Sequence, residues 1–140
     1  MNPEIGVLLM NVGTPDSPEV GDVRKYLSQF LNDPRVIDIP WVARKILVNA
    51  IIVPFRAPKS AKIYKQMWTD EGSPLLIHSE NFKNGLQESL GEKYQVEIAM
   101  RYQSPSVEEG LEKIRKNNPK KIIVVPMYPQ YASSSTGTCM

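Results

Sequence analysis

The sequence is poor in the two side chains that most often bind transition metals. It contains one cysteine, Cys139, and one histidine, His78. A single cysteine excludes a disulfide within the chain and a metal centre built only from cysteines. A single histidine excludes a site in which several histidines of one chain hold a metal. We therefore predict no metal site in these residues.

Several segments that indicate a location or a ligand are also missing. No uncharged apolar stretch reaches about 18 residues, the length that spans a bilayer. No charged-then-apolar leader precedes the first apolar run, so we expect an unprocessed cytoplasmic protein. The glycine patterns that cradle phosphates, and the G-x-S-x-G turn of many hydrolases, are absent. The net charge of +2 is too small to indicate a nucleic-acid partner.

Acidic residues are absent from one long segment, residues 39–69. The segment holds six basic residues: Arg44, Lys45, Arg56, Lys59, Lys62 and Lys65. It is also rich in apolar residues, among them Trp41 and Phe55. Basic and apolar residues together favour an amphipathic anionic ligand or a lipid surface. A cationic helix face in solvent explains the pattern equally well.

Short apolar runs alternate with segments of helical periodicity. We predict strands at residues 5–12, 96–101 and 122–125. The first is a short apolar run, the second has apolar residues at alternate positions, and the last is fully apolar. We predict helices at residues 18–31, 40–53, 58–68 and 75–90, and one more that begins after Ser106. This order of elements predicts an α/β fold, a parallel sheet with helices on both faces.

Local signals set the expected helix ends. Ser17 is expected to cap the first helix, with Pro18 at its first position. Pro54 is expected to stop the second helix. Ser106 and Glu109 have the spacing of a capping box.

Ligands of parallel α/β sheets bind outside the carboxyl ends of the strands. Here that edge comprises residues 11–14, 101–104 and 127–137. Its tyrosines, Tyr102, Tyr128 and Tyr131, are either half-buried lids or rings that stack on a flat ligand. Arg101 either pairs with a carboxylate of a ligand or forms a salt bridge at the sheet edge. The pattern alone indicates a domain that binds a large, apolar, anionic molecule.

Four segments, in order along the chain, resemble one known family. They are Leu8 to Pro15, Asp22 to Leu27 with Phe30 to Asp33, Tyr64 to Leu75, and Tyr128 to Gly137. Together they are similar to ferrochelatase, the protohaem ferro-lyase. The resemblance implies insertion of ferrous iron into protoporphyrin IX, the terminal step of haem biosynthesis.

The resemblance also implies an architecture. The family has two similar chelatase-like, Rossmann-like α/β lobes with a porphyrin cleft between them. We expect residues 1–140 to form a single lobe, the first half of such an enzyme, with the C-terminal lobe as its partner. In some members the apolar lip of the cleft faces a membrane, so we expect peripheral membrane contact through residues 39–69.

Porphyrin-binding residues follow from the resemblance position by position. Val12, Gly13 and Thr14 are expected near the macrocycle. Arg56, Tyr64 and Ser73 are expected at the lip and near the propionates. The floor of the cleft is expected to comprise Arg101, Tyr102, Tyr128 and Ser134.

The resemblance places no catalytic residue in this chain. The family's catalytic histidine and glutamate lie in the second lobe, and His78 does not fall in the histidine motif. We therefore expect the 140 residues alone to be inactive. The resemblance further implies that ferrous iron is a substrate of the enzyme and that no cofactor is permanently bound. One cysteine cannot hold the iron–sulfur cluster of some members. Two alternatives are a non-catalytic porphyrin- or haem-binding module and a short metal chelatase whose site forms between two chains.

Overall fold

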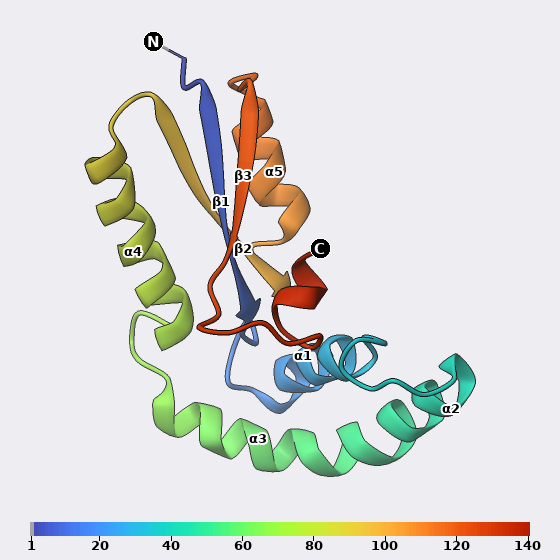
Figure 1. The fold of residues 1–140 in the computed structure, drawn as a ribbon. Coiled ribbons are helices and arrows are strands. Elements are labelled where there is room, and N and C mark those ends of the chain that lie inside the picture. The colour runs from blue at the N-terminus through green and yellow to red at the C-terminus, as the bar shows by residue number, and fades with distance from the viewer. Residues whose placement is uncertain (1) are drawn as a thin grey trace.

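The protein forms a three-stranded parallel sheet flanked by helices (Figure 1). The structure is a computed structural model and describes residues 2–140. Strands β1 (Ile5–Gly13), β2 (Tyr94–Tyr102) and β3 (Lys121–Pro126) lie in the order β2-β1-β3. Ile5 pairs with Tyr94 on one side and with Lys121 on the other. The predicted α/β fold is confirmed.

The two faces of the sheet are covered by different helices. Successive side chains of a strand point to opposite faces, so β1 supplies both cores. Val7 and Leu9 pack in a cluster with helix α4 (Pro74–Leu90), whereas Leu8 and Met10 pack in a cluster with helix α5 (Val107–Arg115). A Cβ on Gly110 would lie 2.8 Å from the Leu8 side chain, so the glycine lets α5 approach the sheet closely.

β3 is an edge strand, and its apolar side chains are more exposed than those of β1. Val124 is 44% exposed and Val125 36%. Within residues 2–140, β3 pairs only with β1. The strand itself is confirmed, but the apolar run does not indicate burial on both faces here.

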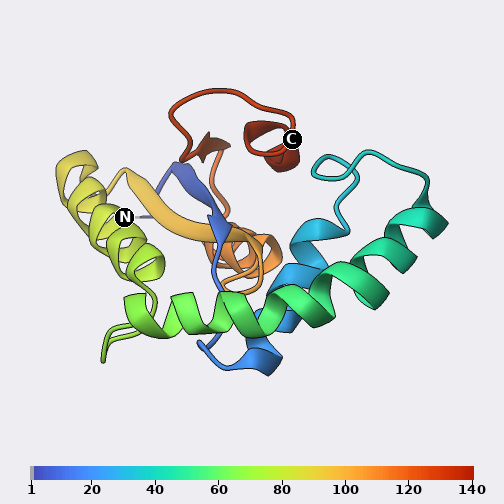
Figure 2. The same cartoon turned by 90° about the horizontal axis from the view of Figure 1, so that it is seen from below.

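A third layer lies at the carboxyl ends of the strands and consists of α1 and one long curved rod (Figure 2). Helix α1 spans Val20–Leu31. The rod comprises helix α2 (Trp41–Ile46), the π-helix η1 (Leu47–Ile52) and helix α3 (Val53–Met67). Buried side chains of α1 and α3, together with Tyr102 of β2, form the core that joins this layer to the sheet.

The predicted break at Pro54 is wrong. The Val53 N–H donates to the carbonyl oxygen of Val48, five residues back, as in a π-helix. Pro54, which has no N–H to donate, comes next in the first turn of α3, and the rod continues through it. The expected helices 40–53 and 58–68 are therefore one continuous rod, with Pro58 inside it.

The start of α1 also differs from the prediction. The helix begins at Val20, with Glu19 as its N-cap residue. The Ser17 hydroxyl instead accepts from the Glu19 N–H at 3.2 Å and donates to Asp22 at 2.5 Å. Ser17 therefore stabilises the turn before the helix. The capping box of Ser106 and Glu109 at the start of α5 is confirmed.

Candidate functional site

Three segments distant in the sequence meet at the carboxyl ends of the strands. Gly13, at the end of β1, lies opposite Tyr102, at the end of β2. The segment after β3 returns over the same edge and ends in the short helix η2 (Thr136–Cys139) (Figure 1). The sheet edge expected to hold a ligand is therefore the edge at which these segments meet.

Gly13 is required by the geometry of this edge. Its φ of 114° lies in a region that side chains disfavour, and a Cβ would lie 2.1 Å from the carbonyl oxygen of Tyr102. No larger residue fits between the two strand ends. The glycine thus lets the chain turn sharply from β1 into the site.

A buried pair of hydroxyls forms one side of the site. Thr14 Oγ1 and Ser73 Oγ lie 2.7 Å apart, and both residues are buried. Ser73 is the N-cap residue of α4, so the contact joins the end of β1 to the start of α4. Both residues line a cavity of about 300 Å³ with three more of the expected porphyrin-binding residues, Val12, Gly13 and Tyr64.

Five aromatic rings form a wall from the sheet edge to the end of α3. Tyr102 packs edge-on against Phe30, with 5.2 Å between ring centroids, and Phe30 lies parallel to Tyr26 at 6.0 Å. Tyr26 packs edge-on against Tyr64, and Tyr64 packs edge-on against Trp68, with 6.4 Å between ring centroids in each pair. Tyr26, Tyr64 and Trp68 line the cavity. Tyr26, Phe30 and Trp68 were not predicted from the sequence, although the (i, i+4) spacing of these rings on two helices was a signal.

The hydroxyls of this site stay protonated at neutral pH. Burial raises the pKa of Tyr26, and the neighbouring Tyr64 raises it further. Burial raises the pKa of Tyr128 to about 12, and Cys139 adds to the rise. Within residues 2–140 the buried Tyr128 hydroxyl has no hydrogen-bond partner. A buried polar atom of this kind is a natural contact for a ligand.

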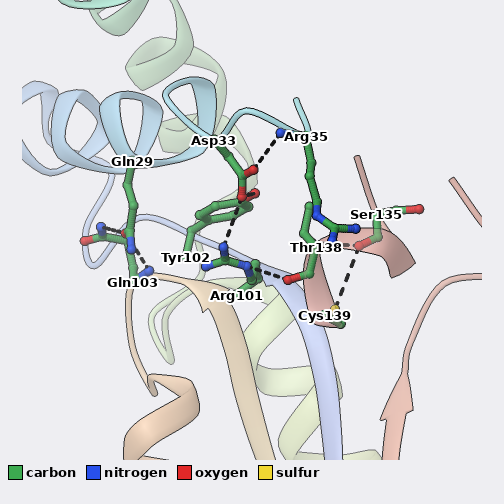
Figure 3. A network of polar contacts seen from close by, with 9 residues as sticks. All are labelled: Gln29, Asp33, Arg35, Arg101, Tyr102, Gln103, Ser135, Thr138 and Cys139. Atoms are coloured by element: carbon green, nitrogen blue, oxygen red, sulfur yellow. Dashed lines mark hydrogen bonds and ion pairs between the residues drawn. The ribbon is translucent and has the colours of Figure 1, made fainter. Parts of the chain in front are cut away.

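Arg101 forms an ion pair at the sheet edge (Figure 3). Its Nη2 donates to Oδ2 of Asp33 at 3.1 Å, and its Nε donates to the Thr138 carbonyl at 2.7 Å. The Tyr102 hydroxyl donates to the same Asp33 oxygen at 2.8 Å. Burial and Asp33 hold the pKa of Tyr102 well above its usual value. Of the two roles expected for Arg101, the structure shows the salt bridge.

A family model described as Ferrochelatase matches residues 4–140. The chain belongs to the ferrochelatase family. It is 48% identical over 139 residues to a ferrochelatase of Coxiella burnetii (strain CbuG_Q212), a match that covers 99% of this chain and 39% of the relative. It is 50% identical over 137 residues to a ferrochelatase of Marinomonas sp. (strain MWYL1), a match that covers 95% of this chain and 42% of the relative. It is 44% identical over 135 residues to a ferrochelatase of Legionella pneumophila (strain Paris), a match that covers 96% of this chain and 40% of the relative.

The chain therefore spans about two fifths of the length of these ferrochelatases. Family membership confirms the resemblance found in the four sequence segments. The ten expected porphyrin-binding residues remain predictions, and the structure divides them into groups. One group of five lines the 300 Å³ cavity: Val12, Gly13, Thr14, Tyr64 and Ser73.

The other five expected residues lie outside that cavity lining. Arg101 and Tyr102 share the ion-pair network, and Tyr128 is close enough to Arg101 for its charge to affect the Tyr128 pKa. Arg56 is exposed on α3, where its charge partly offsets the rise in the pKa of Tyr64 caused by burial. Ser134 is exposed in the segment after β3.

Asp33 is a functional candidate that was not predicted from the sequence. The Asn32-Asp33-Pro34 segment indicated only a helix end, and the side-chain partners of Asp33 lie 68 and 69 positions away. In the part of the chain that the structure describes, no three His, Cys, Asp or Glu side chains are placed to hold one metal ion.

Proposed function

We propose that this chain forms the porphyrin-binding lobe of a ferrochelatase that inserts ferrous iron into protoporphyrin IX. The observation that carries the proposal is the cavity at the carboxyl ends of the strands, bordered by the aromatic wall. A macrocycle is flat and apolar, so aromatic rings suit its faces. Its two propionates need donors, which Tyr64, Ser73 and the nearby Arg56 offer.

Iron insertion requires loss of two pyrrole protons and entry of a ferrous ion. A positioned base is the usual device for such proton transfer. His78 lies exposed on α4 and is not part of the cavity lining. We propose that this lobe supplies the macrocycle wall and the propionate donors, whereas the catalytic base comes from the remaining part of a ferrochelatase. The 140 residues alone are then inactive.

An anaerobic metal-insertion assay tests this function. Protoporphyrin IX with ferrous iron or zinc is added to this chain and, separately, to the protein at its natural length. We expect both proteins to shift the porphyrin spectrum. Metalloporphyrin bands should form only with the protein at its natural length. Metal insertion by the 140 residues alone would place the chemistry within them, and a dimer would then favour the alternative of a site between two chains. A shift without metal insertion at either length would favour a non-catalytic porphyrin-binding module.

Tryptophan fluorescence locates the bound porphyrin. The chain has two tryptophans; Trp68 lines the cavity, and Trp41 is 64% exposed on α2. In a Trp41→Phe variant, porphyrin should quench the emission of Trp68. A Trp68→Phe variant, which leaves only Trp41, is the matched control and should be quenched much less. Equal quenching of both variants would place the porphyrin outside the cavity.

We further propose a cytoplasmic protein that contacts a membrane surface through residues 39–69. The rod exposes seven large apolar side chains: Trp41, Val42, Ile46, Ile51, Phe55, Ile63 and Met67. Four exposed basic residues flank them: Arg56, Lys59, Lys62 and Lys65. Arg44 does not belong to this surface, because it is buried and donates to the Ile39 carbonyl at 2.9 Å. Within residues 2–140, every helix is too short or too polar to cross a bilayer.

Vesicle sedimentation tests the membrane contact. Basic residues near an anionic bilayer contribute about 1 kcal/mol each, so vesicles with anionic lipid should bind more chain than neutral vesicles. Phe55→Glu should weaken binding, because Phe55 is 73% exposed on the rod. Phe82→Glu is the matched control, since Phe82 is 50% exposed on α4, away from the rod. Equal binding by the two variants would contradict the proposed surface.

A further inference from the structure

Asp33 is a buried carboxylate at the junction of three segments. It follows α1, and its side chain is 6% exposed. Oδ1 accepts from the Arg35 N–H at 2.8 Å, and Oδ2 accepts from both Tyr102 and Arg101 (Figure 3). A buried charge is costly unless it is paired and hydrogen-bonded, and here both oxygens have donors. The carboxylate is therefore held firmly and can in turn hold its partners.

Arg101 is fixed from two sides by these contacts. Asp33 holds Nη2, and the Thr138 carbonyl holds Nε, while Thr138 itself donates from Oγ1 to the Ser135 carbonyl at 2.7 Å. No hydrogen bond within residues 2–140 uses Nη1 of Arg101. The residue borders two cavities, of about 630 and 360 Å³, which are distinct from the 300 Å³ cavity at the end of β1. The guanidinium is thus oriented, and the Arg101 side chain is 34% exposed.

Tyr102 is oriented by the same oxygen. Its hydroxyl donates to Asp33, and the Arg101 guanidinium carbon lies 5.0 Å from the centre of its ring. Tyr102 is also the first ring of the aromatic wall, in edge contact with Phe30. A shift of Asp33 would therefore move a cation and an aromatic ring together.

We propose that Asp33 is a positioning residue for porphyrin binding and metal insertion: it fixes Arg101 and Tyr102 so that they meet the macrocycle in one orientation. This inference rests on the proposed function. Asp33 does not touch the porphyrin and acts through its two partners. A purely structural role is the competing explanation, because the Asp33 carbonyl also accepts from the Val36 and Ile37 N–H groups and closes the turn.

A mutant cycle separates the two explanations, with the protein at its natural length. Asp33→Asn keeps the shape and removes the charge. The hydrogen bonds that Asp33 accepts from Arg101 and Tyr102 are strengthened by its charge. Because the variant weakens them, we expect kcat for metal insertion to fall at least about tenfold. The absorption band of the bound porphyrin should shift as well. Asp38→Asn is the matched control, because Asp38 is exposed just after this turn, and it should leave both readouts unchanged.

The decisive comparison is the same substitution in an Arg101→Met, Tyr102→Phe background. If Asp33 acts through these residues, Asp33→Asn should change kcat there by less than about twofold, because coupled residues are not additive. An undiminished loss in that background would show that Asp33 only supports the turn and would overturn the proposal. Wild-type values for Asp33→Asn alone would also overturn it.

A second variant keeps the test informative if Asp33→Asn does not fold. Arg101→Lys retains a positive charge beside Asp33 but loses the planar, pre-oriented donor edge. We expect normal resistance to urea with a lowered kcat and a shifted porphyrin band. An unchanged kcat and band would overturn the proposal. If the wild-type protein neither binds porphyrin nor inserts metal into it, the proposed function itself is contradicted. If the wild-type protein does both and the variants behave like it, only the positioning role of Asp33 is contradicted.

Discussion

Thr14 Oγ1 lies 2.7 Å from Ser73 Oγ, although 59 positions separate the two residues in the sequence. This hydrogen bond is the buried link between the end of β1 and the first residue before α4. Because both hydroxyls are withdrawn from water, each needs the other as a partner. The contact therefore fixes the position of α4 relative to the cavity at the strand ends.

Removal of both hydroxyls should cost less than the sum of the two separate removals. Thr14→Val, or Ser73→Ala, leaves a buried hydroxyl without its partner and should lower the free energy of unfolding by about 1 to 3 kcal/mol. The double variant leaves no unpaired group, so its loss should be smaller than the sum of the single losses. Urea unfolding followed by circular dichroism measures all three values. Additive losses would show that the hydroxyls do not depend on each other.

Gly13 should not tolerate alanine. The Cβ would lie 2.1 Å from the Tyr102 carbonyl oxygen, and the φ of 114° adds backbone strain. Strain and overpacking together should lower the free energy of unfolding by about 3 kcal/mol or more. Gly21→Ala is the control, because Gly21 is in α1 and a Cβ there would meet no atom within 4 Å. That variant should be more stable by about 0.5 to 1 kcal/mol, since alanine is the better helix former.

Elements with a local signal were predictable from the sequence. Apolar runs indicated β1 and β3, apolar residues at alternate positions indicated β2, and the spacing of Ser106 and Glu109 indicated the cap of α5. Pro54 was misleading because its effect depends on the turn before it, and the π-helical pattern of η1 has no simple signal in composition. The exposure of β3 was not predictable either, because an apolar run does not say which strands lie beside it.

The site was only partly predictable for a related reason. Val12, Gly13, Thr14, Tyr64 and Ser73 came from the resemblance, and the fold brings them to one cavity. Asp33 has no such signal, because its side-chain partners Arg101 and Tyr102 lie on β2, which follows the whole rod and α4 in the sequence. Long-range polar contacts of this kind follow from tertiary packing and not from spacing.

Ser106→Ala should loosen the start of α5. The Ser106 hydroxyl accepts from the Glu109 N–H at 3.2 Å, and the Ser106 N–H donates to the Glu109 carboxylate at 2.7 Å. Loss of a cap of this type costs about 1 kcal/mol. Ser89→Ala is the control, because the Ser89 hydroxyl only bonds back to the Gly85 carbonyl within α4 and is exposed. Its free energy of unfolding, measured in urea, should stay close to that of the wild type.

Alkaline pH should destabilise the protein through its buried tyrosines. Burial raises the pKa of Tyr128 to about 12, and it raises the pKa values of Tyr26, Tyr64 and Tyr102 as well. An unfolded tyrosine titrates near about 10, so the unfolded chain loses these protons first and binds fewer of them. The tyrosine contribution to stability is therefore complete below about pH 10 and is lost progressively above it, with the part due to Tyr128 lost between about pH 10 and 12. Urea unfolding from pH 8 to 11.5, with tyrosinate absorbance as a second signal, measures the effect.

Tyr128→Phe should lose less stability over this range than the wild type, whereas the lysines that titrate in the same range are common to both proteins. Identical slopes for the two proteins would show that the Tyr128 hydroxyl is as easily ionised in the folded state as in the unfolded state.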